Sequence, residues 1–276
     1  MYLINANTLE LESVVGTPPK YAILSHTWGD NEVSYSDFQD TAKRQHQPRF
    51  KKIELTCRQA QRDGFEYSSS AELSEAINSM FKWYRDAQKC YAYLEDAPQE
   101  LLGWTLQELI APRKLTFYGP GWVSIGEKDD LSQVLELITG IDKSVLQHSQ
   151  ALSSISVVKR MSWAARRNTT RIEDVAYCLM GIFDVNMPML YGEGEKAFER
   201  LQEEILKQTK DNSLFAWRAS SNSAAYRGLF AASPDEFLQS YDIEPFPNLS
   251  GGKSPPSFTS RGSMLQNRGS FRRLAC

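Results

Sequence analysis

The sequence predicts an α/β fold in which a parallel β-sheet is flanked by helices and followed by a mostly helical extension. Over about the first 125 residues, short apolar runs that end in turn residues alternate with segments of helical spacing. Helical spacing dominates from about residue 130, and the end of the chain is rich in Gly, Ser and Pro. We therefore expect an α/β domain at 1–125, a helical extension packed on it at 126–218, and a poorly ordered basic tail at 219–276.

The first three helices and strands predict the order of the sheet domain. Residues 21–25 are typical of a strand that ends in a turn at 29–30. The apolar positions of residues 53–60 share one helix face, and that helix can end at Gly64. Residues 69–72, Ser-Ser-Ala-Glu, match a capping box that opens a second helix. The apolar stripe of this second helix consists of Leu73, Ala76, Ile77, Met80, Phe81 and Tyr84.

The remaining elements of the sheet domain are shorter. Residues 90–94 and 115–118 are typical of strands, and residues 104–110 of a short helix that stops near Pro112. The alternation favours a parallel sheet, whose ligands lie beyond the carboxyl ends of the strands. Residues 25–30 and 95–96 are expected at that edge.

The extension is expected to contain three helices. The first has Leu131, Val134, Leu135 and Ile138 at helical spacing. The second opens with a capping box at residues 170–173 and buries Val175, Leu179 and Phe183. The third, at 195–210, has Phe198, Leu201 and Ile205 on one face, and residues 212–218 form either a last strand or a docking segment. Behind them, residues 249–276 contain five cations and no Asp or Glu, which favours a mobile, solvated terminus over a surface for anionic partners.

Composition and charge exclude several classes of protein. Hydrophobic residues make up 41% of the 276 residues and charged residues 24%, as in ordinary globular proteins. The net charge of -3 provides no basic footprint for nucleic acid. No apolar run is long enough to span a bilayer, and the N-terminus lacks the basic region of a signal peptide. We expect a cytoplasmic protein without a membrane span or a nucleic-acid partner.

The cysteines and histidines do not predict a metal site. No pair of cysteines has metal-ligand or redox spacing, and the histidines do not cluster with them. We expect free thiols in a reducing compartment and no required cofactor. The residues concerned are Cys57, Cys90, Cys178, Cys276, His26, His46 and His148.

Two segments contain residue types that could carry chemistry. Residues 21–30 end a strand in hydroxyl, imidazole and indole groups, which suit either a nucleotide or the hydrogen bonds of a turn. Glu108 lies on a short helix, either as a solvated surface residue or as a carboxylate that stabilises cationic character at a sugar carbon. Residues 191–197 contain two glycines before a helix, but acidic Glu193 and Glu195 occupy the place of an anion, so we interpret them as a helix start.

Several blocks of the sequence together resemble the fungal heterokaryon incompatibility (HET) domain. The three HET-like blocks are residues 21–38, 71–81 and 103–112, and the segments that often follow them resemble residues 161–167, 173–183 and 189–194. Members of this family are linked to nonself recognition and regulated cell death in filamentous fungi. The family pattern is also similar to a divergent Toll/interleukin-receptor-like (TIR-like) fold, with a parallel sheet in flavodoxin-like order.

The resemblance implies a chemistry and a site. Residues 104–109 resemble the Trp-x-x-x-Glu-Leu helix in which TIR enzymes carry their NAD-cleaving glutamate, so Glu108 is implied as the catalytic residue. Ser25, His26, Trp28, Asp30 and Trp104 are then implied near the nucleotide, and NAD is implied as the substrate, cleaved at the nicotinamide–ribose bond. The resemblance also implies self-association through TIR-like surfaces. Any sensor module is expected on another chain or is absent, because this sequence contains no P-loop or propeller repeat.

The sequence departs from the family pattern in two places. After residues 64–67 the family usually has a hydrophobic strand and loop, whereas Ser68 to Ser70 follow here. After residues 94–96 it usually has an Arg-Trp-Phe segment, whereas residues 97–102 alone lead to Gly103. The first departure predicts a lost edge strand, and the second a shorter approach to Glu108. Three interpretations stay open: an active NAD-cleaving effector, a self-associating module without activity, and an inactive truncated member.

Overall fold

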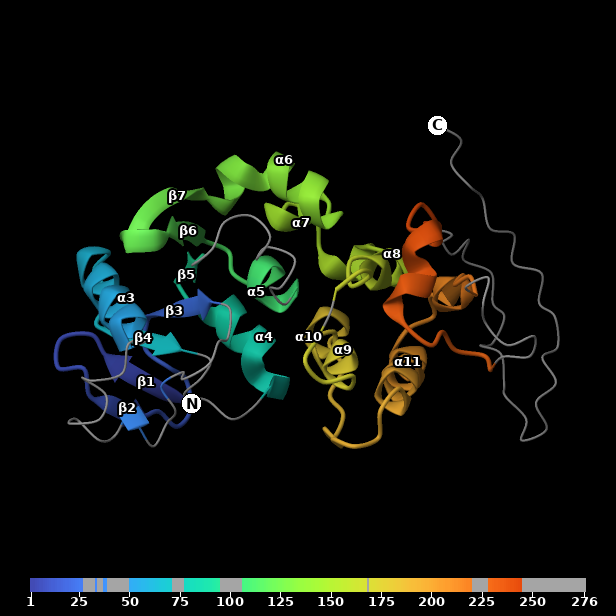
Figure 1. Ribbon diagram of the computed structural model, residues 1–276, viewed down its shortest axis with the longest axis horizontal. Coiled ribbons are helices and arrows are strands. Elements are labelled where there is room, and N and C mark those ends of the chain that lie inside the picture. The colour runs from blue at the N-terminus through green and yellow to red at the C-terminus, as the bar shows by residue number, and fades with distance from the viewer. Residues whose placement is uncertain are drawn as a thin grey trace.

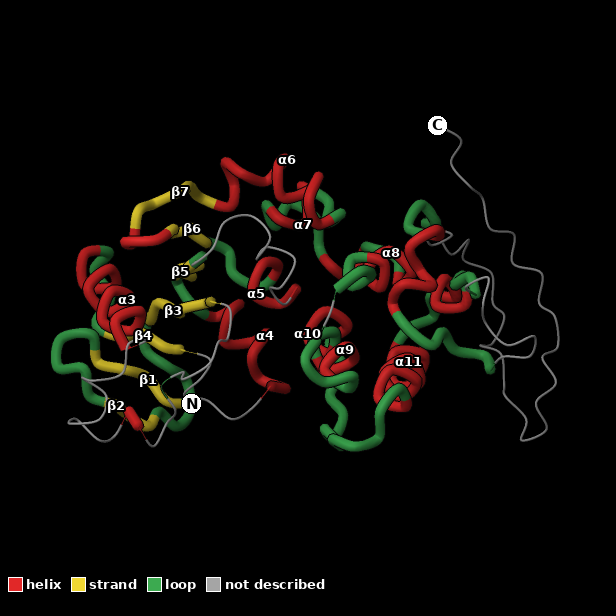
Figure 2. The backbone as a smooth tube through the Cα atoms, viewed as in Figure 1, coloured by secondary structure: helices red, strands yellow, loops and turns green. Residues whose placement is uncertain are grey.

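The computed structural model describes residues 1–26, 33, 37–38, 50–70, 77–94, 106–167, 169–219 and 228–244. The strands lie together on one side of the described structure, and the later helices, from α8 on, lie on the other side (Figures 1 and 2). Within these ranges, no helix is long and apolar enough to cross a membrane. The α/β class expected from the sequence is therefore confirmed at the level of one mixed sheet with flanking helices.

Seven strands form one mixed sheet in the order β2-β1-β4-β3-β5-β6-β7. The four central strands are parallel, while the hairpin of β1 and β2 and the last strand β7 are antiparallel to their neighbours. The strands are β1 (Tyr2–Asn5), β2 (Leu11–Ser13), β3 (Tyr21–His26), β4 (Tyr67–Ser70), β5 (Lys89–Tyr93), β6 (Leu115–Gly119) and β7 (Val123–Glu127). The sequence predicted three of the parallel strands, but neither the hairpin nor β7.

The two faces of the sheet are covered by different elements. Helix α3 (Phe50–Arg62) packs on one face with Ala22 and Tyr91, whereas Ile23, Cys90 and Ala92 belong to the core on the other face. This division follows from the alternation of side chains along a strand. The second face is covered by α4 (Ile77–Asp86), α5 (Leu106–Ile110) and the extension. Helix α3 ends, as predicted, before Gly64, whose φ of 82° is left-handed.

The extension is a series of mostly short helices. The longest are α6 (Lys128–Thr139) and α11 (Lys196–Gln208), and α11 buries Phe198, Leu201 and Ile205 as expected. The shorter helices are α7 (Lys143–Leu146), α8 (Val157–Ser162), α9 (Asp174–Tyr177) and α10 (Met180–Phe183). Single 3-10 turns are η3 (Pro120–Trp122), η4 (Leu152–Ser154), η5 (Asn212–Phe215) and η6 (Pro234–Ser240). The segment that begins at 212 is thus a docking turn that buries Leu214, not a strand.

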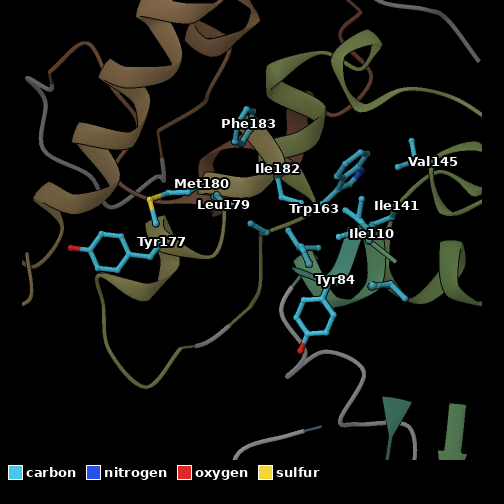
Figure 3. Close-up of a cluster of buried hydrophobic side chains, with 14 of the residues drawn as sticks. Tyr84, Ile110, Ile141, Val145, Trp163, Tyr177, Leu179, Met180, Ile182 and Phe183 are labelled. Carbon is cyan, nitrogen blue, oxygen red and sulfur yellow. The ribbon is translucent and has the colours of Figure 1, made fainter. Parts of the chain in front are cut away.

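One hydrophobic core joins the sheet to the extension. Tyr84 and Ile110, from the sheet side, and Trp163, Ile182 and Phe183, from the extension, belong to the same cluster of buried side chains (Figure 3). Helix α10 approaches α4 so closely that a Cβ built on Gly181 would lie 2.2 Å from the Cβ of Phe81. The two parts are therefore packed backbone against side chain, without a layer of solvent between them.

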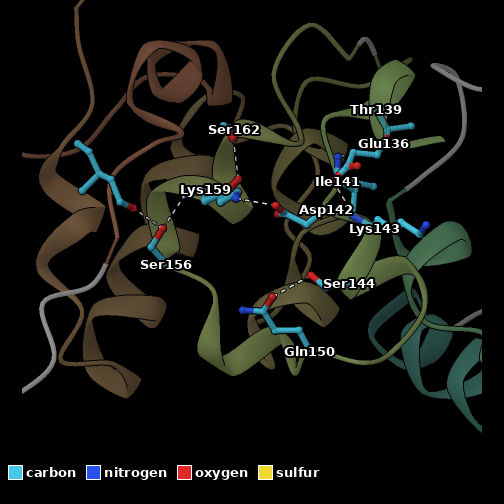
Figure 4. A network of polar contacts seen from close by, with 11 residues as sticks. Glu136, Thr139, Ile141, Asp142, Lys143, Ser144, Gln150, Ser156, Lys159 and Ser162 are labelled. Atoms are coloured by element: carbon cyan, nitrogen blue, oxygen red, sulfur yellow. Dashed lines mark hydrogen bonds and ion pairs between the residues drawn. The ribbon is translucent and has the colours of Figure 1, made fainter. Parts of the chain in front are cut away.

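A polar network holds the extension together around α8 (Figure 4). Lys159 Nζ donates to Asp142 Oδ1 at 2.7 Å, which links α8 to the residue before α7. Ser156 Oγ caps α8 at Lys159 N and donates to the Ile243 carbonyl at 2.8 Å. Glu136 of α6 accepts from Lys143 N at 2.9 Å. These contacts hold α6, α7 and α8 in place relative to one another, and they attach Ile243 to α8.

Both capping boxes predicted from the sequence are wrong. Ser69 and Ser70 lie in β4, between β1 and β3, and α4 begins only at Ile77. A short strand thus occupies the place where the sequence predicted a lost one. Glu173 does not reach back to its own helix start, because its Oε1 accepts from Gly192 N at 2.7 Å and from Gly194 N at 3.1 Å. The carboxylate therefore closes the glycine loop before α11.

Helix α6 turns only part of its apolar stripe inward. Of the four periodic positions, Leu135 is buried and Leu131 is half-buried against the core, while Val134 and Ile138 are exposed. The buried face also includes Lys128, Ser132 and Thr139. Polar and apolar side chains therefore share the covered face of this helix.

Candidate functional site

Ser25 and His26 lie at the carboxyl end of β3. Only 1% of Ser25 and 6% of His26 is exposed. β3 pairs with β4 on one side and β5 on the other, and the chain reaches these neighbours through α3 and α4 on opposite faces. The strand order therefore reverses at β3, and such a reversal is where ligands bind in open α/β sheets.

Glu108 lies in α5 and is buried, with 4% of its surface exposed. The Tyr84 hydroxyl of α4 donates to Glu108 Oε1 at 3.1 Å. Tyr84 itself is completely buried. In this hydrogen bond the phenol proton points to Glu108, and the phenol oxygen stays available as an acceptor.

Tyr84 brings Ser25 and Glu108 into one cluster. Burial raises the pKa of Tyr84 well above its usual range, and the negative potentials of Glu108 and Cys90 add to the increase. The Ser25 hydroxyl is close enough to oppose this increase, although Ser25 Oγ forms no hydrogen bond of normal geometry. The Ser25 hydroxyl is thus buried beside the tyrosine that holds Glu108, and it joins the two residues into one polar cluster.

The extension contributes polar groups on the other side of α5. Gln107 Nε2 donates to the Cys178 carbonyl at 2.8 Å, at the end of α9. Burial lowers the pKa of the Arg167 guanidinium to about 10, and the negative potentials of Cys178 and Glu108 oppose the decrease. Burial raises the pKa of the Cys178 thiol to about 12, and Asp174 and Glu108 add to the increase. Glu108 is thus surrounded by residues from α4, α5 and the extension.

This arrangement suits charge stabilisation better than metal chemistry. Among the described residues, no group of three or more His, Cys, Asp or Glu side chains is placed to hold a metal ion. The cluster instead combines one buried carboxylate, two hydroxyls and one guanidinium, from Glu108, Tyr84, Ser25 and Arg167. A carboxylate in surroundings of low dielectric interacts strongly with a positive charge that develops beside it.

A cavity of about 460 Å³ is lined by none of these four residues and lies at the amino ends of the parallel strands. Its lining includes Lys20, directly before β3, and Lys114, directly before β6. Parallel strands start at that end, so the cavity lies at their amino ends. We place the candidate site at the Glu108 cluster because its member Ser25 lies near the carboxyl end of β3, where ligands bind in such sheets.

Comparison with known proteins connects this fold to a fungal process. The chain is 45% identical, over 225 residues that cover 70% of it, to vegetative incompatibility protein HET-E-1 of Podospora anserina. The chain is a relative of a fungal heterokaryon incompatibility protein. It spans 16% of the length of that relative. Residues 196–236, from α11 to η6, match a domain of unknown function, DUF8212. No solved structure matches the chain.

The structure brings together two of the six residues implied by the HET and TIR resemblance, since Ser25 and Glu108 meet through Tyr84. His26, the next residue of β3, points to the other face of the sheet, as the alternation of side chains along a strand requires. Trp28, Asp30 and Trp104 lie outside the described residues. Tyr84 was missed because its position on an apolar stripe is typical of core residues. Arg167 and Gln107 were missed because nothing in the sequence indicates which loops of the extension reach α5.

Proposed function

We propose that this chain acts in vegetative incompatibility as part of nonself recognition. The support is its 45% identity to HET-E-1, an incompatibility protein by name. Since the chain corresponds to 16% of that protein, the proposal concerns the role of this unit and not the activity of the whole relative. Regulated cell death, a sensor protein on another chain and self-association through TIR-like surfaces belong to the same proposal.

The proposed chemistry is cleavage of NAD at the nicotinamide–ribose bond, in a TIR-like domain formed by the sheet and its helices. The order of the four parallel strands supports this fold, because numbering them along the chain gives 2-1-3-4, as flavodoxin-like sheets begin. The observation that supports the chemistry is the buried Glu108, which is held by Tyr84, a residue that also lies beside Ser25 near the carboxyl end of β3.

In the proposed reaction, the bond between C1′ of the ribose and N1 of nicotinamide breaks, and the bonding electron pair leaves with nicotinamide. The positive charge of the pyridinium thereby moves to the sugar, where the Glu108 carboxylate stabilises it. Water then adds its oxygen to C1′ and releases a proton. Tyr84 fixes the carboxylate, and the unpartnered Ser25 Oγ accepts or donates a hydrogen bond at a ribose hydroxyl.

The burial of Glu108 sets a condition on this function. With 4% of its surface exposed, the carboxylate is not open to a dinucleotide in the described conformation. Substrate entry therefore requires an opening around α5 before the reaction. Slow turnover that is limited by this opening is expected.

The test is nicotinamide release from NAD by the purified chain, measured by chromatography. We expect Glu108→Gln to reduce the rate by about 100-fold or more, because it removes the charge that stabilises the sugar cation. Tyr84→Phe should reduce the rate less, since it removes only the hydrogen bond that holds the carboxylate. Glu199→Gln, which changes an exposed glutamate of α11, is the matched control and should retain full activity.

Two results would contradict the proposed chemistry. One is a folded wild-type chain, verified by circular dichroism, that releases no nicotinamide. The other is release that is equal in the wild type and in Glu108→Gln. Neither result would touch the role in incompatibility, which is tested separately by expressing the chain in fungal cells and scoring growth arrest.

A further inference from the structure

The cavity at the amino ends of the parallel strands has the size of a small-molecule site. Its volume of about 460 Å³ falls within the usual range of such sites, roughly 300–1,000 Å³. It is lined by the residues that begin β5, β6 and α6, with Phe65 and the residue before β3 at its side. The lining residues with charge are Lys20, Lys89, Arg113, Lys114, Lys128, Asp63, Glu127 and Asp129.

The residues that line this cavity have a positive net charge, although the chain as a whole is negative. Five cations and three carboxylates surround it, whereas the whole protein has a net charge of -3. The carboxylates are partly engaged: Asp63 pairs with Lys89 at 3.2 Å and accepts from the Tyr91 hydroxyl at 2.8 Å, and Glu127 is 3.9 Å from Lys89. Lys89 is thereby neutralised within the lining.

Three of the cations have no such partner. Lys20, Arg113 and Lys114 form no ion pair within the described part of the chain, and all three are exposed. They come from two separate places, before β3 and before β6, yet line one cavity. A single ion pair with one carboxylate cannot satisfy cations that approach from two sides, whereas a ligand with several negative groups can.

The start of α6 adds backbone donors at the same place. Lys128 and Asp129, the first residues of this 12-residue helix, line the cavity, and the Glu127 side chain does not cap the helix. The unpaired N–H groups of a helix start favour an anion. The Asp129 carboxylate opposes an anion there, so the ligand must carry enough charge to be held mainly by the three unpaired cations.

We propose that this cavity binds a small phosphorylated molecule with at least two phosphate groups. Phosphate oxygens fit both the guanidinium of Arg113 and the amino groups of Lys20 and Lys114. Two groups match the two places from which the cations come, before β3 and before β6, because β5 separates these strands in the sheet. The site is separate from Glu108, so it stands or falls independently of NAD cleavage.

The test is isothermal titration calorimetry of the full chain with inorganic pyrophosphate. We expect saturable one-to-one binding that weakens as sodium chloride is raised, because the contacts are between charges. The double variant R113A/K114A should weaken binding by about tenfold or more, since it removes two charges within several ångströms of the ligand. K82A/K210A, which removes two exposed lysines elsewhere, is the matched control and should leave the affinity unchanged.

Three outcomes would overturn the proposal. They are no saturable binding at low ionic strength, an equal loss in K82A/K210A and R113A/K114A, and binding of citrate as tight as that of pyrophosphate. The second outcome would indicate attraction to overall charge, and the third a site without preference for phosphate. Both double variants change only exposed side chains, and circular dichroism verifies that they fold.

Discussion

Lys128 is a charged residue whose side chain is almost completely withdrawn from water. Only 1% of it is exposed, and its Nζ donates to the carbonyls of Leu109, at 3.3 Å, and Pro112. His148 Nε2 lies 3.2 Å from the same amino group. Lys128 thus satisfies carbonyl groups at the carboxyl end of α5, the helix that contains Glu108. Burial lowers the pKa of Lys128 to about 8.

This lowered pKa makes the stability of the protein depend on pH. Between pH 8 and 10.5 the unfolded chain holds a proton that the folded chain has lost, so the free energy of unfolding rises with pH in this window. We expect an increase of about 2 kcal/mol between about pH 7.5 and about pH 9.5 from this residue alone. Urea unfolding of the wild type and of Lys128→Met at both pH values measures the difference.

The comparison with Lys128→Met is needed because other groups titrate in the same range. Burial raises the pKa of the Cys57 and Cys178 thiols to about 12, so these thiols lower the stability as the pH rises above 9. Both proteins share this effect, and it cancels in the difference. Equal slopes in the wild type and in Lys128→Met would show that Lys128 is not the cause. Lys82→Met, at an exposed position, should behave as the wild type.

At the scale of single residues, the sequence predicted where a residue lies within its helix or strand better than which residues surround it. Ser25 was expected at the end of a strand, and it lies there. The burial of Glu108 could not be predicted, because it results from packing by α4 and by an extension whose loops carry no signature of their partner. Lys128 was missed for the same reason: a lysine beside two aspartates at a helix start looks like a surface residue.

At the scale of elements, apolar periodicity predicted the buried face correctly for helices that pack with a single face against the rest of the protein. Helices α3 and α11 bury the stripes that their sequences predict. Local polar signals failed, because Ser69 and Ser70 match a helix cap but form a strand, in which β1 and β3 supply the backbone partners on both sides. In α6 only two of the four periodic residues pack inward, since periodicity shows that a helix has an apolar face without showing how much of that face is covered.

The contact between α10 and α4 predicts a sensitive position. Gly181→Ala should lower the free energy of unfolding by about 2 kcal/mol or more, because the new Cβ would overlap the Cβ and ring of Phe81 and force the helices apart. Gly228→Ala is the control, since nothing lies within 4 Å of a Cβ there and its φ is not left-handed. Chemical unfolding of both variants measures the effect. If the two variants unfold alike, the helices are not in tight contact.

At the scale of the whole molecule, the shared core decides what can fold alone. The buried side chains of α4 and α5 form one cluster with residues from α6 to η6. In a chain that ends at residue 125, the apolar side chains of α4 and α5 that pack against the extension would be exposed to water. The free energy gained by burying them would be lost. We expect the 1–125 piece to be aggregated or unfolded and the 1–244 piece to be folded, as measured by circular dichroism and size-exclusion chromatography. A cooperative unfolding transition of 1–125 would contradict this.

The arrangement of the whole could be predicted only in part. The alternation of helices and strands indicated the α/β class and the parallel centre of the sheet. The hairpin of β1 and β2 could not be predicted, because short strands of mixed polarity do not differ from loops by pattern. The boundaries expected at residues 125 and 218 stay predictions. Of the tail expected at 219–276, residues 228–244 include η6 and bury Ala231 and Phe237 in the core, while residues 245–276 lie outside the described residues.

The contact between Gly181 and Phe81 also has a consequence for heredity. These positions lie 100 residues apart in the chain, yet no side chain at 181 is compatible with the present place of Phe81. Exchange of gene segments between related chains, with a crossover between the two positions, would separate two residues that pack directly against each other. Recombinants that inherit a larger residue at 181 would be lost unless α4 came from the same parent. Selection should therefore keep α4 and α10 together as one inherited unit.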